Sequence, residues 1–357
     1  MKIGIVGLPN AGKTTLFNAL TRAAAETAVY PFTTVDPNVA VVEVPDERLG
    51  AVAEVVGASP VVPETIEFHD IAGLVRGAAE GEGLGNRFLA GIRETDAVCH
   101  VVRTHFDEGV PHPEGRIDPG ADIHAVEAEL MLADVEQAEG RLARVAKQAG
   151  SGDPDAAVER AWLGEVVDAL RRGDAVRTVP VPDGAGGAPE HLQALTSKPV
   201  LYVANVDEGV TEVPSAVFEH AERSGAGAVA IAARIESDLA EMEPAEAGEM
   251  REELGLTESG LERVIRADYE LLGLITFFTA HEGSEARARS LPRGGTAWDA
   301  AGRVHSDIQA GFVRAEVTPW RELVEAGGYA AARERGVLRT EGRDYVVGDG
   351  DVITIRH

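Results

Sequence analysis

The chain has 357 residues, of which 44% are hydrophobic and 26% charged, and a formal net charge of −27. Its length exceeds what one hydrophobic core usually organises, and its composition excludes the fibrous and disordered classes. The negative charge repels nucleic acid and anionic membranes at long range, so contact with RNA requires a local basic surface. A high-salt cytoplasm would favour the same excess of carboxylates.

The single cysteine and the start of the chain point to a reducing compartment. Cys99 cannot form an internal disulfide, and the sequence opens on an apolar run without a basic and apolar leader. We therefore expect a cytoplasmic protein, and we expect it to be a monomer. No run of about 18 apolar residues occurs, so we expect no membrane partner. Cys99 lies in the apolar run 97–102 and is predicted to be a small core residue.

The chain begins with the order strand, glycine-rich loop and helix. Residues 2–6 are apolar, residues 7–14 read GLPNAGKT, and residues 13–24 have helical spacing. In the pattern GxxxxGK[ST], glycines let backbone N–H groups face phosphate oxygens, Lys13 reaches the β- and γ-phosphates, and the Thr14 hydroxyl ligates Mg²⁺. We predict a phosphate-binding loop for a nucleoside triphosphate. Its expected contacts are Asn10, Ala11, Gly12, Lys13, Thr14 and Thr15.

Two later segments supply the remaining metal ligands. Residues 66–73 end in Asp-x-x-Gly after an apolar run, which puts Asp70 where it can hold a metal-bound water. Residues 30–34 read YPFTT and lie where a switch loop would bring a threonine hydroxyl to the metal, with a plain loop as the alternative. The expected ligands of Mg²⁺ are Thr14, Asp70 and Thr34, with Thr33 as the alternative to Thr34.

The group that activates water is missing from its usual place. Many GTPases carry a glutamine directly after the glycine of Asp-x-x-Gly, and that position is Leu74 here. An aliphatic side chain cannot orient water. We therefore expect slow intrinsic turnover and a catalytic group from another part of the chain.

The middle of the chain predicts an antiparallel pair of helices. Residues 123–147 and 154–172 are rich in Ala, Glu, Leu and Arg, and Gly and Pro residues in 150–154 separate them. Residues 180–189 are dense in Pro and Gly and predict a loop that leads back to the sheet.

The base-recognition segment departs from the guanine-specific pattern. Guanine-binding proteins use Asn-Lys-x-Asp, whose aspartate accepts hydrogen bonds from guanine, whereas residues 205–208 read NVDE. The lysine is absent and Glu208 replaces the aspartate, so selection of guanine is doubtful. An ordinary polar strand end is the alternative. The residues expected near the base are Asn205, Val206, Glu208 and Ala232.

The last part of the chain is β-rich. Strands are expected at 274–279 and 286–291, a helix at 297–310, and a final hairpin of two strands within 345–355. A local group of basic residues, which a solvated surface explains equally well, comprises Arg287, Arg289, Arg293, Arg303 and Arg314.

These elements together predict an α/β protein. Apolar runs at 40–44, 65–71, 97–102, 200–203 and 228–232 alternate with helices, as in a mostly parallel sheet. The expected parts are a P-loop nucleotide-binding domain of residues 1–122 and 196–273, an inserted α-helical coiled-coil hairpin of residues 123–195, and a β-rich domain of residues 274–357.

Over nearly its whole length the chain resembles the Obg-like ATPases, the YchF branch of the translation-factor class of P-loop GTPases. The resemblance rests on GLPNAGKT, YPFTT, NVDE and above all DIAGLVRGAAEGEGLGN at residues 70–86. It implies an OBG-type G domain, a C-terminal TGS domain, and a preference for ATP over GTP. The implied partners are the ribosome, through its large subunit, and RNA, through the TGS domain.

The resemblance also implies two functional residues. His112, in a loop after the apolar run 97–102, matches the family's water-orienting histidine, and a solvent-exposed loop histidine is the alternative. Asn10 matches a position that coordinates K⁺ in related GTPases, which implies K⁺ as a second cation. Two other functions stay open: a true GTPase, and a nucleotide-gated binding module in which hydrolysis is incidental.

Overall fold

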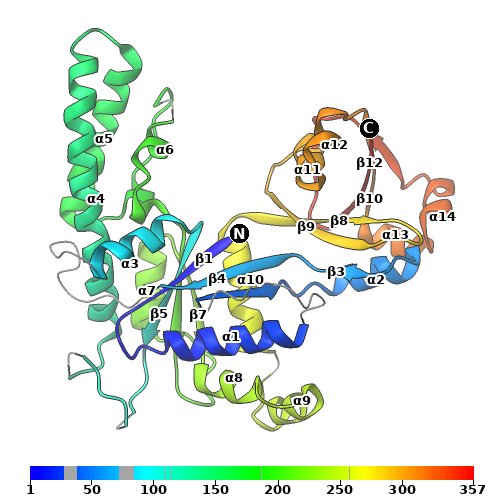
Figure 1. Ribbon diagram of the computed structural model, residues 1–357, viewed down its shortest axis with the longest axis horizontal. Coiled ribbons are helices and arrows are strands. Elements are labelled where there is room, and N and C mark those ends of the chain that lie inside the picture. The colour runs from blue at the N-terminus through cyan, green and yellow to red at the C-terminus, as the bar shows by residue number, and fades with distance from the viewer. Residues whose placement is uncertain (28–37, 72–83, 108, 114, 186, 257) are drawn as a thin grey trace. The chain divides into compact units, whose positions relative to one another are not determined.

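The computed structural model describes residues 1–27, 38–71, 84–107, 109–113, 115–185, 187–256 and 258–357. The chain folds as two units, of which the first comprises Met1–Val42 and Glu67–Leu271 and the second Glu43–Ile66 and Leu272–His357 (Figure 1). Among the described residues, no helix is both long and apolar enough to cross a membrane.

A six-stranded sheet in the order β2-β4-β1-β5-β6-β7 forms the centre of the first unit. Its strands are β1 (Lys2–Val6), β2 (Val39–Glu43), β4 (Thr65–Asp70), β5 (Ala97–Arg103), β6 (Val200–Asn205) and β7 (Gly227–Ile231). The five strands from β4 to β7 in this order pair in parallel, which confirms the predicted mostly parallel sheet. Parallel strands end at one edge of the sheet, and in such folds ligands bind at that edge.

The first unit contains nine helices among the described residues. They are α1 (Lys13–Thr27), α3 (Leu84–Arg93), α4 (Pro119–Ala149), α5 (Pro154–Arg172), α6 (Ala188–Leu192), α7 (Ser215–Arg223), α8 (Ala233–Leu239), α9 (Pro244–Glu253) and α10 (Gly260–Leu271), with short 3₁₀ turns η1 (Val176–Thr178) and η2 (Leu195–Ser197). All residues of β5 are buried, as expected for a parallel strand with both faces covered. Cys99 is 0% exposed, which confirms that it is a core residue.

Helices α4 and α5 form the expected helical pair and lie side by side in Figure 1. Each begins with an aspartate cap followed by proline: Asp118 accepts from the Ala121 amide, and Asp153 accepts from the Asp155 and Ala156 amides. Trp162 of α5 is buried in a hydrophobic cluster that contains residues of both helices. The first helix starts at Pro119, four residues before the expected start, because the cap and proline precede its apolar positions.

The second unit contains another six-stranded sheet, in the order β11-β10-β12-β8-β9-β3. Its strands are β3 (Val61–Val62), β8 (Leu274–Ala280), β9 (Ala286–Pro292), β10 (Arg314–Pro319), β11 (Arg339–Glu341) and β12 (Asp351–Arg356), and its helices are α2 (Glu47–Val56), α11 (Ala297–Val304), α12 (Ser306–Ala310), α13 (Trp320–Ala326) and α14 (Tyr329–Glu334). Residues 43–66 therefore belong with the C-terminal residues in this structure. The sequence pattern instead assigns residues 43–66 to the nucleotide-binding domain. The division into three domains stays a prediction.

The expected hairpin within residues 345–355 is wrong. Only β12 forms there, and it pairs with β10 and β8, while Val346 makes an isolated bridge to Thr296. The Asp351 carboxylate accepts hydrogen bonds from the Gly348 amide and the Tyr345 hydroxyl, both at 2.8 Å, and so closes a local turn. Partners distant in the sequence thus replace the expected local pairing.

A buried carboxylate in α10 leads to a prediction about stability. Asp268 is 0% exposed, and neither of its oxygens has a hydrogen-bond partner among the described residues. Burial raises the pKa of Asp268 well above the usual value, so ionisation of this carboxyl group opposes folding. Each unit of such a shift costs about 1.4 kcal/mol. We expect Asp268→Asn to raise the free energy of unfolding by about 1 to 3 kcal/mol at pH 7 in urea titrations.

The sign of the pH dependence provides a control. The raised pKa means that the wild type has its full stability below the unfolded pKa of about 4 and loses stability as the pH rises toward the folded pKa. The advantage of Asp268→Asn must therefore shrink toward pH 4. Glu270→Gln, an exposed position on the same helix, should change stability little at any pH. A destabilised Asp268→Asn protein, or a gain independent of pH, would contradict this account.

Candidate functional site

The loop between β1 and α1 has a backbone that requires glycine at two positions. Gly7 has φ +150°, and a Cβ there would lie 2.4 Å from the Val101 carbonyl oxygen. Gly12 has φ +103°, and a Cβ there would lie 2.3 Å from Asn205 Nδ2. Asn10 adopts the left-handed region as well, with φ +63°. The tight turn leads directly into the N-terminus of α1, where backbone N–H groups favour an anion.

Lys13 lies across this loop. Its Nζ donates hydrogen bonds to the carbonyl oxygens of Gly7 at 3.0 Å and Leu8 at 2.8 Å, and the residue is 8% exposed. Burial lowers the pKa of Lys13, and the nearby carboxylate of Asp70 opposes this shift. An ammonium group has three donors, so Lys13 can hold the loop closed and still donate to a phosphate oxygen.

Asp70 ends β4 beside the lysine. Burial raises the pKa of its carboxyl group, and Lys13 opposes the shift. The oxygens of Asp70 and Thr14 suit Mg²⁺, which uses one or two protein oxygens together with substrate phosphates. The described part of the chain contains no group of three or more His, Cys, Asp or Glu residues able to hold a metal. Of the other predicted residues, Thr33, Thr34 and Leu74 lie outside the described part of the chain.

Asn205, at the end of β6, joins three loops. Its Nδ2 donates to the Ala11 carbonyl at 3.1 Å, its Oδ1 accepts from the Ala233 amide at 3.2 Å, and the residue is 6% exposed. Its backbone carbonyl accepts from the Thr104 hydroxyl at 2.8 Å. Both ends of the side-chain amide are thus engaged by protein. Asn205 fixes the phosphate loop against the start of α8.

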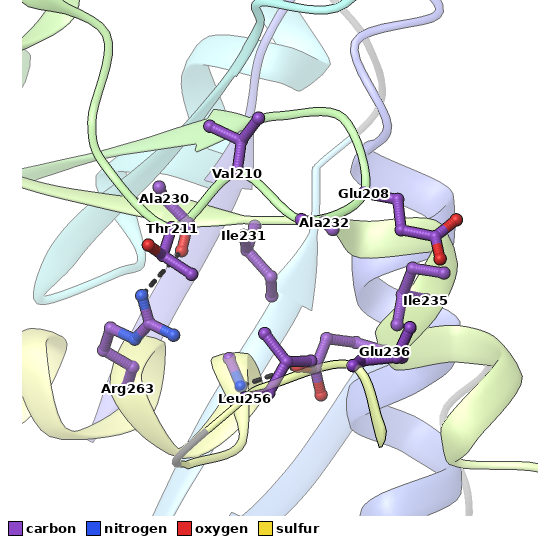
Figure 2. Close-up of a pocket in the computed structure, with 13 residues that line it drawn as sticks. Glu208, Val210, Thr211, Ala230, Ile231, Ala232, Ile235, Glu236, Leu256 and Arg263 are labelled. Carbon is purple, nitrogen blue, oxygen red and sulfur yellow. Dashed lines mark hydrogen bonds between the residues drawn. The ribbon is translucent and has the colours of Figure 1, made fainter. Parts of the chain in front are cut away.

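A small hollow lies beside these loops (Figure 2). Its apolar lining includes Val210, Ile231, Ala232, Ile235 and Leu256. Glu208 is exposed at its side, whereas Val206 is buried and does not line it. An apolar lining with few polar groups is typical of a site for a flat ring system.

Buried polar contacts support this hollow. Glu236 of α8 is 4% exposed, and its carboxylate accepts from the Gly260 amide at 2.7 Å and the Ser259 hydroxyl at 3.1 Å. Figure 2 shows Glu236 and Arg263 on the side formed by α8 and α10. The sequence does not single out Glu236, because its partners lie 23 and 24 residues farther along the chain.

The loop after β5 carries His112. The alternative prediction, that His112 is a solvent-exposed loop histidine, is wrong. The side chain of His112 is 5% exposed, and its Nε2 lies 2.8 Å from Oδ2 of Asp122, whose side chain is 6% exposed. Asn10 Nδ2 donates to the Pro111 carbonyl at 3.0 Å, so the phosphate loop directly contacts the residue before the histidine. The structure therefore brings the His112 loop and the phosphate loop together.

Arg103, the last residue of β5, organises the same loop. The residue is 2% exposed. Its guanidinium donates to the carbonyl oxygens of His105 at 3.2 Å, Asp107 at 3.3 Å and Val110 at 2.8 Å. Three bonds from one buried guanidinium hold the loop as a folded unit. Neither Arg103 nor Asp122 was a predicted site residue, since their roles depend on the path of a loop.

Comparisons with known proteins find similar chains that span the whole sequence. Residues 2–134 match a family model described as 50S ribosome-binding GTPase, and residues 274–357 match the YchF-GTPase C-terminal family, described as a protein of unknown function. A ribosome-binding ATPase YchF of Bacillus subtilis is 48% identical over 359 residues, which cover 99% of this chain and 98% of the relative. The protein of the same name from Escherichia coli O157:H7 is 46% identical over 355 residues, with 99% and 98% covered. The solved YchF GTPase of Schizosaccharomyces pombe is 32% identical, with a TM-score of 0.88 over 100% of this chain and 97% of its own.

Proposed function

The chain belongs to the YchF family, and from this premise we propose that it hydrolyses ATP to ADP and phosphate with Mg²⁺, prefers ATP to GTP, and acts as a ribosome-associated switch in the cytoplasm. The observation that carries the proposal is the phosphate loop. Lys13 is held across it by two carbonyl oxygens beside the Asp70 carboxylate. This arrangement supports binding of a triphosphate and its metal ion.

Residues 10–15 would surround the phosphates. The Thr14 hydroxyl, the Asp70 carboxylate and Thr34 would hold Mg²⁺, which neutralises charge on the β- and γ-phosphates when bound. Lys13 would stabilise the same charge from the loop. A K⁺ ion is proposed next to Asn10, whose amide nitrogen binds Pro111 and whose amide oxygen is the atom suited to a cation. We retain the division into an OBG-type G domain, a helical insertion and a TGS domain that contacts RNA.

The hollow beside β7 is the proposed base site. Its apolar residues, including Ala232, would pack against the ring, while Glu208 lies where guanine-specific proteins have aspartate. A longer side chain at this position moves the carboxylate away from the place that guanine donors need. The carboxylate of Glu208 therefore discriminates between the bases through hydrogen bonding. A site that leaves a hydrogen-bonding group of the wrong base unpaired selects strongly against that base.

The proposed nucleotide preference is tested by competition. We expect ATP to displace a fluorescent nucleotide at lower concentration than GTP, and Glu208→Asp to shift the affinity ratio toward GTP by about 10-fold, since a hydrogen bond to a charged group contributes about 1.5 to 3 kcal/mol. Asp207→Asn, a change at the exposed neighbouring position, is the control. Tighter GTP binding by the wild type would instead identify a GTPase.

The proposed partner is tested with the same protein in sedimentation. The names of the B. subtilis and E. coli relatives describe ribosome binding. We expect the chain to sediment with ribosomes, and with the large subunit when subunits are separated, more strongly with a non-hydrolysable ATP analogue than with ADP. Equal sedimentation with both nucleotides would argue against a nucleotide-controlled switch.

A further inference from the structure

A histidine and an aspartate are buried together at the edge of the proposed catalytic site. His112 Nε2 and Asp122 Oδ2 are 2.8 Å apart, and the two side chains are 5% and 6% exposed. The separation is that of a hydrogen bond. A carboxylate withdrawn from water is strongly destabilised if its partner is removed, so this contact constrains the histidine more than a surface contact would.

The aspartate is attached to a rigid support. Asp122 lies in the first turn of α4. The apolar residues Ile123 and Val126 of the same helix are buried in the core, with exposed fractions of 0% and 1%. One turn later, Glu127 accepts a hydrogen bond from the Tyr202 hydroxyl at 2.5 Å and lies 3.1 Å from His220. Although burial opposes it, contact with these two side chains lowers the pKa of Glu127 to about 2, so the anchor is ionised. The start of α4 is therefore fixed to the sheet.

The histidine is held on its other side by its own loop. Arg103 binds the carbonyl of Val110 at 2.8 Å, and Asn10 of the phosphate loop binds the carbonyl of Pro111 at 3.0 Å. These two contacts lie two residues and one residue before His112, respectively. The position of His112 relative to the phosphate loop is thus set by the loop backbone, and the orientation of its ring is set by Asp122.

The contact also favours one tautomer of the neutral ring. An ionised carboxylate only accepts hydrogen bonds, so Asp122 favours the tautomer of His112 with the proton on Nε2. The lone pair of the neutral ring is then on Nδ1. A water-orienting histidine needs such a lone pair, and a carboxylate partner that fixes the tautomer of a histidine is a common supporting arrangement.

We propose that Asp122 is a positioning residue for hydrolysis, which orients His112 and keeps the proton of its neutral ring on Nε2. This inference rests on the proposed role of His112. Asp122 acts only through the histidine, so its loss should change the chemical step and leave nucleotide binding intact. The inserted helix α4 thereby becomes part of the catalytic apparatus, because it carries the residue that orients the ring.

The direct test is Asp122→Asn. Asparagine has the same shape, but its amide can donate to Nε2 and so favours the wrong tautomer. We expect kcat to fall about 100-fold or more while KM for ATP changes less than about 3-fold. Asp122→Glu should restore part of kcat because it restores an acceptor. Asp118→Asn is the matched control: it removes one charge from the same helix end and keeps a good cap, so turnover should stay at the wild-type level.

Further measurements separate the possible outcomes. A double variant His112→Ala/Asp122→Asn should be no slower than His112→Ala alone, and ¹⁵N NMR of labelled histidine should assign the proton to Nε2 in the wild type. An unchanged or raised kcat in Asp122→Asn, an additional loss in the double variant, or an Nδ1–H tautomer would overturn the inference. If Asp122→Asn does not fold, kcat of Asp122→Glu and the NMR tautomer decide. Full turnover by His112→Ala would instead remove the proposed function of the histidine, whatever the tautomer.

Discussion

Replacing Lys13 with alanine should abolish measurable ATP hydrolysis and weaken ATP binding by about 100-fold or more, because the variant loses the cation that stabilises the charge on the β- and γ-phosphates. Two further effects act in the same direction. The loop loses the hydrogen bonds from Nζ to the carbonyls of Gly7 and Leu8. Asp70 loses the positive charge that lowers its pKa, which weakens it as an anionic support for Mg²⁺. Isothermal titration calorimetry and phosphate release measure the two losses separately.

The control for this variant is another lysine at the same end of the chain. Lys2 is exposed at the start of β1, so Lys2→Ala removes an equal charge without touching the phosphate loop and should leave turnover unchanged. Circular dichroism and thermal melting would show whether Lys13→Ala keeps its fold. A folded Lys13→Ala protein that hydrolyses ATP at the wild-type rate would refute the assignment of the loop.

The phosphate loop could be predicted from the sequence because its requirements are local. Gly7 and Gly12 occupy positions where a Cβ would collide with neighbouring atoms, and Lys13 must follow the second glycine to reach back across the loop. The strand before the loop and the helix after it are recognisable from the local sequence of residues 2–6 and 13–24. The parallel sheet could also be predicted, because strands buried on both faces, such as β5, are continuous apolar runs.

The contacts that support the site were not predictable in this way. Asn205 was expected at the base, yet its amide joins Ala11 and Ala233, which lie 194 and 28 residues away in the chain. Asp122 has the pattern of an acidic residue in the first turn of a helix, which needs no further explanation in a sequence. Only the path of the loop brings His112 to it. Side-chain contacts between distant segments depend on that path, and composition and spacing do not encode it.

The same reasoning explains why the expected hairpin in the second unit is wrong. The apolar residues 345–347 before β12 were expected to form the first strand of a hairpin, but β12 pairs with β10 and β8. Residues 43–66, near the start of the chain, join the sheet of the C-terminal residues through β3 and β9. Strands that are far apart in the sequence pair where a strand edge of the sheet is free to accept them. A local sequence pattern does not reveal which edge that is.

His112→Ala should reduce kcat for ATP hydrolysis by about 100-fold to 10,000-fold while the dissociation constant for ATP changes less than about 3-fold. Leu74 replaces the glutamine that many related enzymes use, so the chain has no water-orienting side chain at that position. His112 is instead held by Asp122 in a loop that Asn10 ties to the phosphate loop. Single-turnover measurements with saturating enzyme would separate the chemical step from release of ADP.

A matched control and a second readout decide what hydrolysis contributes to function. His191 is exposed on α6, so His191→Ala should hydrolyse ATP normally. If hydrolysis drives a switch, His112→Ala should stay on ribosomes after ATP is added, whereas the wild type dissociates as ADP forms. If the variant loses hydrolysis but its ribosome association and cellular growth match the wild type, hydrolysis is incidental and the chain is a nucleotide-gated binding module. The two interpretations share the phosphate loop and differ only in whether His112 is needed, which makes this residue the decisive one.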